Sequence, residues 1–444
     1  MRRILRRIGY ALVVLVIVLA VLFAWFRVRG PSAEQRLALD SLQKDRRPAH
    51  GHNAFPLLWY MRYDVPDADI DARMPADIEE VSKRLAAGDS GTIPFEPSAP
   101  KLPEPKFDDP DLCQTRASDC LGHVTAQPEL TRAALGKYAR TLARAQAIEQ
   151  ADFLWSDFPA DFRAPLDFRF PVAQHLRLSA LALQFRDGDR AGALEGVCRN
   201  ANAWRRLHGG TNSLIGNMIS IVSTDGAIRL FAEMLAALPA GEPIPSACAE
   251  AFRPIEASDV DRCAEMAREF AIADNSMASS LRKAHSVWER FVSWTLFDPE
   301  QTSASRAEGF ASYCGDAAAR RMLADKGVDP GSPLKPSRGV GCIENLLGCV
   351  LTQIAAPAYV DYDARVLDFL AHIRLGRTMI WLHEVPHTPA SLQELFEQRP
   401  RDARSDGHVS GVDLEHRVIF VESFNQRREK RFELPLSAGF FTNR

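Results

Sequence analysis

The residues His383-Glu384-Val385-Pro386-His387 form the pattern in this chain that is most suggestive of chemistry. In a continuous helix the two imidazoles would lie one turn apart on one face, where they could bind zinc with the glutamate as general base. Pro386 falls inside that turn, removes a backbone donor, clashes with the preceding turn and disfavours helical backbone at Val385. The sequence therefore predicts the end of a helix here, with no metal and no cofactor.

The pattern resembles the zincin metalloproteases over these five residues only, and it is interrupted by proline. We find no phosphate-binding loop, dinucleotide fingerprint or nucleophile elbow in the sequence. A catalytic site would therefore have to be assembled from helices that are distant in sequence. The histidines spread widely enough to meet acids in this way are His123, His175, His208, His285 and His372. A cleft that holds one of them beside a carboxylate, with a perturbed pKa, would favour a hydrolase.

The segment 152–170 contains six aromatic residues interleaved with acids and arginines. Two prolines exclude a single long helix over this segment. Aromatic anchors surrounded by charges are typical of a protein contact surface, so these residues are interface candidates. We favour the alternative, a strap that buries its rings on the helical body, because connecting segments are commonly held down in this way. The candidates are Phe153, Trp155, Phe158, Phe162, Phe168 and Phe170.

Eight cysteines, an even number, favour disulfides over metal or redox chemistry in a chain that is exported. Cys113 and Cys120 flank a short loop after a proline-rich stretch, so we expect them to pair. Cys342 and Cys349 have the same spacing, but their surroundings predict a helix. Seven helical residues span about 10 Å, whereas a disulfide requires Cα atoms within about 7 Å. We therefore expect these two not to pair with each other.

The remaining pairings are expected from the order of the predicted helices. Cys248 and Cys263 flank a break at 254–258 and could join a helical hairpin, and Cys314 would then pair with Cys342. Cys198 and Cys349 would either pair or remain buried thiols. The sequence thus predicts that six cysteines form disulfides: Cys113, Cys120, Cys248, Cys263, Cys314 and Cys342.

Residues 8–26 form an unbroken apolar run without a charge. Nineteen helical residues span roughly the 30 Å hydrocarbon core of a bilayer. The run ends in Trp25 and Phe26 rather than in the small residues of a peptidase site, which favours a retained anchor over a cleaved signal. Four arginines precede the run and two follow it closely. The positive-inside rule therefore predicts a cytoplasmic N-terminus and an exported body.

The amino-acid composition limits which cellular compartment and which classes of binding partner the protein can have. Beyond residue 30 the chain carries 48 basic and 57 acidic residues, and this acidic balance argues against nucleic acid as a partner. Only nine of the 54 basic residues are lysines, a bias typical of GC-rich bacterial genomes. We therefore predict a single-pass protein of the bacterial inner membrane with its body in the periplasm, in contact with the lipid bilayer through residues 8–26.

The predicted fold class is mostly α: a transmembrane helix, a body of helical bundles or hairpins, and a small C-terminal β-hairpin. The expected order is a basic tail (1–7), the anchor (8–26), a membrane-proximal helix with a proline-rich wrapping segment (27–127), the helical body (128–400) and the hairpin tail (401–444). Apolar periodicity predicts two helices within 175–208 joined at Gly188-Asp189, and a long one over 341–384. Strands are predicted at 412–424 and 431–436.

Two classes of function are compatible with this sequence. The first is non-enzymatic: an anchored helical body that contacts another protein of the cell envelope in an accessory, assembly or protective role. The second is a membrane-tethered periplasmic hydrolase with a site built from distant helices. The absence of a local catalytic motif from the sequence favours the first, and the scattered histidines leave the second open.

Overall fold

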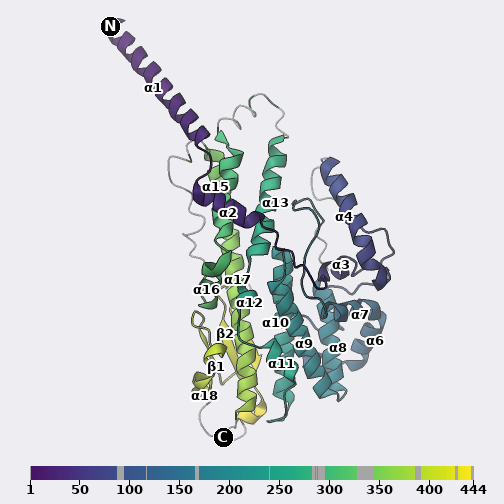
Figure 1. Cartoon of the computed structure of the whole chain (residues 1–444). Coiled ribbons are helices and arrows are strands. Elements are labelled where there is room, and N and C mark those ends of the chain that lie inside the picture. Colours follow the sequence, from purple (N-terminus) through teal and green to yellow (C-terminus); the bar gives the residue numbers. More distant parts are fainter. Residues whose placement is uncertain are drawn as a thin grey trace.

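The computed structural model is mostly helical. It describes residues 2–87, 95–116, 118–165, 170–239, 241–282, 286, 288, 296–327, 342, 345–385, 392–425 and 429–441. Within these ranges there are seventeen α-helices and one three-stranded antiparallel sheet. Helix α1 projects away from the rest of the molecule, and the sheet lies near the opposite end (Figure 1). The predicted class, helical with a small β element near the C-terminus, is confirmed at this level.

The helices follow one another along the chain with short connections. Those of the first half are α1 (Arg2–Arg29), α2 (Ala33–Gln43), α3 (Ala54–Trp59), α4 (Ile70–Ala87), α5 (Cys120–Ala126), α6 (Pro128–Lys137), α7 (Ala139–Ile148), α8 (Phe170–Arg186) and α9 (Arg190–Gly209). Those of the second half are α10 (Leu214–Ala237), α11 (Ser246–Ala251), α12 (Ala257–Val260), α13 (Cys263–Arg282), α15 (Pro299–Ala311), α16 (Gly315–Leu323), α17 (Leu346–Glu384) and α18 (Leu392–Gln398).

The main core is formed by α8, α9, α10 and α17 together with the sheet. Helices α8 and α9 form the predicted hairpin: Gly188 takes a φ of +106°, and the Asp189 side chain caps α9 by accepting from the Gly192 amide. Helix α10 is long and apolar enough to cross a membrane, and 72% of its apolar window is buried inside the body. This burial is typical of a core helix, and α17 packs beside it.

A second core lies between α3, α4, α7 and the segment that follows α7. Its polar centre is Arg144, whose side chain is fully buried. The guanidinium donates to the carbonyls of Tyr60, Tyr63 and Val65 and pairs with Asp67. Because buried polar groups must be satisfied, this arginine holds the turn after α3 against α7.

The sheet has three strands, β1 (Ser410–Asp413), β2 (Val418–Glu422) and β3 (Arg431–Pro435), in the order β1-β2-β3. The single strand predicted over 412–424 is therefore wrong, because that segment is itself a hairpin. Its turn contains Arg417 at a φ of +56°, a backbone conformation that ends an extended run. The inward side chains of β2 and β3 are buried in the main core: Ile419, Val421, Phe432 and Leu434.

The Cys113–Cys120 disulfide forms as predicted, with Cα atoms 5.2 Å apart. The expectation that Cys342 and Cys349 do not pair is wrong, since they form a disulfide with Cα atoms 5.9 Å apart. The reason is that α17 begins at Leu346 and not at residue 341, where the predicted helix begins, and Asn345 before it is non-helical, with φ −131° and ψ 44°. The chain between the two cysteines is therefore not a continuous helix, and the 10 Å separation does not apply.

The expected pairs Cys248–Cys263 and Cys314–Cys342 are also wrong. The observed disulfides are Cys198–Cys248 and Cys263–Cys314, with Cα separations of 4.8 and 4.6 Å. Helix α11 packs against α9, not α13, and this brings Cys248 to Cys198. Cys263 begins α13 and meets Cys314 at the start of α16. All six cysteines assigned from the sequence are in disulfides, but two of their three pairings differ.

Candidate functional site

The predicted helix end near residue 385 is present, since α17 ends at Glu384 and Val385 is extended. His383 lies in the last turn of α17, and its Nε2 is 2.8 Å from the carbonyl oxygen of Glu242. Pro386 and His387 lie outside the described residues. The one imidazole of the pattern that the structure describes is therefore engaged with backbone.

The aromatic segment 152–170 divides into buried and exposed residues. Phe153 and Phe158 are buried, Trp155 is half-buried and Phe162 is 49% exposed. The Phe158 ring meets Trp59 and Phe55 edge-on, with centroids 4.7 and 5.6 Å apart. Phe168 lies outside the described residues, and Phe170 begins α8. The buried rings agree with a strap held down on the second core, and Phe162 is the described residue best placed for an outside contact.

The scattered histidines differ in their surroundings. His123 contacts the Gln127 side chain, and His285 lies outside the described residues. Burial lowers the pKa of His175 to about 4 and that of His208 to about 4, so both are neutral core histidines at pH 7. Of the scattered histidines named above that the structure describes, His372 is the one that pairs with a carboxylate side chain: its Nδ1 is 2.8 Å from Oδ1 of Asp225.

His372 and Asp225 line a pocket of about 330 Å³ between α10, α17 and the sheet. The imidazole is 6% exposed and stacks on Phe432, with ring centroids 3.8 Å apart and an angle of 11° between the planes. A carboxylate only accepts hydrogen bonds, so Nδ1 carries the proton and Nε2 is the basic nitrogen. Nε2 is buried and has no hydrogen-bond partner among the described residues. Nε2 therefore keeps an unused lone pair of the kind that a general base offers to a proton.

The pocket is built from four parts of the chain. They are the residues after Cys113 (Thr115, Arg116), α10 (Met218, Ile221, Val222, Asp225, Arg229), α17 (Arg365, Asp368, His372) and the sheet with its β2–β3 connection (Ser423, Asn425, Glu429). The polar residues recur at helical spacing: 225 and 229 on α10, and 365, 368 and 372 on α17. Helices α10 and α17 thus each turn a stripe of polar residues toward the same pocket.

Asp368 fixes the turn after β2 that forms one wall of the pocket. Its carboxylate accepts from the amides of Phe424 and Asn425, at 2.7 and 3.1 Å, and from Nε2 of His408 at 3.1 Å. The other ring nitrogen of His408 lies 2.9 Å from Asp325. Burial on its own would lower the pKa of His408, but the hydrogen bonds with Asp325 and Asp368 raise it overall. A protonated His408 donates to both carboxylates and holds the turn in place.

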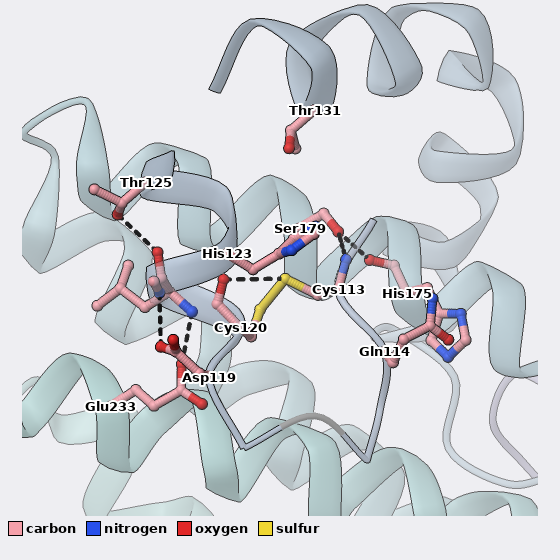
Figure 2. Close-up of a disulfide and its surroundings, with 12 residues drawn as sticks. Cys113, Gln114, Asp119, Cys120, His123, Thr125, Thr131, His175, Ser179 and Glu233 are labelled. Carbon is pink, nitrogen blue, oxygen red and sulfur yellow. Dashed lines mark hydrogen bonds between the residues drawn. A yellow bond between two sulfur atoms is a disulfide. The ribbon is translucent and has the colours of Figure 1, made fainter. Parts of the chain in front are cut away.

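Figure 2 shows the disulfide between Cys113 and Cys120, which closes a short loop. Thr115 and Arg116 of this loop line the pocket. The Cys113 amide donates to Oγ of Ser179 on α8, at 2.7 Å. At Gly226 on α10 a side chain would meet the Thr115 backbone, because a Cβ there would lie 3.0 Å from the Thr115 oxygen. The disulfide and this glycine therefore let the loop pack directly on α10 beside Asp225.

Glu233, one turn beyond Arg229 on α10, caps the helix that follows the loop. Its carboxylate accepts from the Leu121 amide at 2.6 Å, and Figure 2 shows it beside Asp119 at the start of α5. Burial raises the pKa of Glu233 to about 7, although the bond from Leu121 favours the ionised form. The carboxyl group is therefore partly protonated at neutral pH.

Replacing Glu233 by glutamine is expected to weaken the pH dependence of stability. A raised pKa means that the folded state keeps a proton which the unfolded state releases above its ordinary pKa of 4.5. The contribution of Glu233 is therefore fully present below that pH and is lost as pH rises toward 7, by roughly 3 kcal/mol. Urea denaturation of wild type and Glu233→Gln at pH 5 and pH 8 measures this. Glu195→Gln, an exposed glutamate on α9, is the control, and parallel wild-type and Glu233→Gln curves would contradict the assignment.

The described residues contain no group of three histidine, cysteine or acidic side chains that could hold a metal ion. Comparisons with models of protein families, with curated proteins and with solved structures found no match. Asp225, Arg365, Asp368 and His408 were not anticipated from the sequence. A signal for part of the site was nevertheless present, since the only charges in the apolar segment 214–237 are Asp225, Arg229 and Glu233, spaced four residues apart on one helix face.

Proposed function

We propose that the protein is a membrane-tethered envelope hydrolase, with α1 as its anchor and the His372 pocket as its active site. The anchor is supported by the exposure of α1. Its exposed large hydrophobic side chains, including Ile8, Leu12, Val16 and Trp25, are 47–70% exposed, and the helix projects from the body (Figure 1). A contiguous apolar surface of this size is unfavourable in water and favourable in lipid.

The proposed orientation places residues 1–7 in the cytoplasm and the body in the periplasm of a bacterium. It is supported by the arginines before the apolar run and by the four disulfides, which persist in oxidising compartments. An alkaline phosphatase fused after Arg444 is expected to be active in cells, because that reporter folds only after export. A fusion lacking residues 1–29 should lose this activity. Fluorescence from a C-terminal cytosolic reporter instead would contradict the orientation.

The observation that carries the hydrolase proposal is the bond between His372 Nδ1 and Asp225 at the wall of the pocket, which leaves Nε2 without a partner. Nε2 would take a proton from water while the water oxygen bonds to an acyl carbon. The same proton would then pass to the leaving oxygen or nitrogen as its bond to that carbon breaks. Asp225 would stabilise the imidazolium in between. The reaction consumes one water and regenerates the imidazole.

An activity screen on the detergent-solubilised full chain tests the reaction class. 4-Nitrophenyl acetate and butyrate report acyl hydrolysis, while 4-nitrophenyl phosphate and a 4-nitrophenyl glycoside report the two other common hydrolytic classes. We expect turnover of the acyl esters above the rate of protein-free buffer. Release of nitrophenol from the phosphate or glycoside alone, or from none of the four, would contradict the proposal.

Contact with another envelope protein is a second proposal, supported by a different surface. The first turns of α17 expose four apolar side chains at i, i+1, i+4 and i+5, which lie on one helix face: Leu346, Leu347, Val350 and Leu351. A photo-crosslinking residue in place of Leu347 is expected to capture one specific protein in cells, and the same residue in place of the exposed Leu130 should not. Equal capture patterns at the two positions would argue against a partner there.

A further inference from the structure

Most charges in the pocket are already matched within the protein. Arg229 pairs with Glu429 at 2.6 Å and lies over the Phe432 ring, 4.1 Å from its centroid. Asp368 accepts from three donors, and Asp225 is engaged with His372. Each acid that lines the pocket therefore has a cationic or hydrogen-bond donor partner. None of these acids forms a strong ion pair with the other two arginines of the pocket.

Those two arginines are Arg365 on α17 and Arg116 on the disulfide loop. The nearest carboxylate of Arg365 is Asp361, one turn away at 3.4 Å and 29% exposed. A surface pair at this spacing contributes only about 0.3–0.5 kcal/mol. The Nε of Arg365 is buried and has no hydrogen-bond partner among the described residues, and Nη1 contacts only the sulfur of Met218, at 3.9 Å. Arg365 also lies over the Tyr362 ring, 4.9 Å from its centroid, and its side chain is 23% exposed, so it is a partly buried cation with an unused donor at Nε.

We infer that the pocket takes substrates through a carboxylate bound by Arg365 with Arg116 at the rim, and that its substrates are short acyl compounds with a free carboxylate. The planar guanidinium matches the two oxygens of a carboxylate. Met218, Ile221 and Val222 give the same pocket an apolar wall, which suits the uncharged remainder of such a molecule. A peptide with a free C-terminus has both features. This inference rests on the proposed function for the reaction, but binding can be measured without it.

Calorimetry with N-acetyl-alanyl-alanine and its C-terminal amide tests the inference on the solubilised full chain. The two probes differ only in the carboxylate. We expect the acid to bind wild type at least tenfold more tightly than the amide. The Arg365→Gln variant should bind the acid about 10- to 100-fold more weakly than wild type. The affinity of Arg365→Lys should lie between the two, because lysine keeps the positive charge but lacks the paired N–H donors of the guanidinium. Arg199→Gln removes an exposed arginine on α9 and should match wild type.

The outcomes separate this inference from the proposed function. Selective binding of the acid that is lost in Arg365→Gln supports the inference, whether or not mass spectrometry finds the peptide cleaved. Equal affinities for acid and amide, no binding of either, or unchanged selectivity in Arg365→Gln would overturn it, even if the nitrophenyl esters are hydrolysed. Tenfold tighter binding of inorganic phosphate than of the acid would also overturn it, by assigning the arginines to a phosphate.

Discussion

Substitution of His372 by alanine is expected to lower kcat for the best nitrophenyl ester by about 10²- to 10⁴-fold, the usual contribution of a general base. The physical reason is that Nε2 of His372 is the basic nitrogen in the pocket and its orientation is set by Asp225. Asp225→Asn should cause much of the same loss, because an amide can present its NH₂ to Nδ1 and favour the wrong tautomer. Initial rates at saturating ester measure both effects.

The chain offers a matched control on its surface. His416 also pairs with an aspartate, Asp413 at 3.0 Å, but its side chain is 69% exposed and lies outside the pocket. His416→Ala should leave kcat unchanged. Because His372 is buried on Phe432, His372→Gln is needed as a variant that preserves volume, with circular dichroism to show that it folds. A folded His372→Gln protein with the wild-type rate would contradict the proposed site.

Replacement of Phe158 by alanine is expected to destabilise the protein by about 3–5 kcal/mol, the usual cost of deleting a buried aromatic ring. The ring is 3% exposed and meets Trp59 and Phe55 edge-on, so its removal leaves a cavity in the second core. Phe162→Ala, four residues along the same segment, removes a ring that is 49% exposed and should cost less than about 0.5 kcal/mol. Urea midpoints of the two variants measure the difference.

These two variants also separate the strap from the contact surface. Under the strap interpretation, Phe158→Ala loses stability and neither variant changes the set of proteins recovered with the solubilised chain. Loss of one recovered protein in Phe162→Ala, at unchanged stability, would instead assign the exposed part of the segment to an interface. If the two substitutions destabilised the protein equally, this would contradict the finding that Phe158 is buried while Phe162 is exposed.

Patterns that depend on neighbouring residues were predicted well. The α8–α9 hairpin, the end of α17 and the Cys113–Cys120 loop follow from capping, proline and loop length, all of which act within a few residues. The position at which a helix begins was predicted less well, about one turn too early for α17. A predicted helix that begins at residue 341 instead of Leu346 excludes a disulfide that the structure contains.

The helical class, the apolar run at 8–26 and the polar residues available for chemistry can all be predicted from the order of the amino acids. The contact of His372 with Asp225, 147 residues away, and the disulfide between Cys198 and Cys248 follow from the three-dimensional packing alone. Periodicity states which face of a helix is polar, but not which helix that face meets. That choice depends on the packing of whole helices, here α10 against α17 and α11 against α9, and no short pattern encodes it.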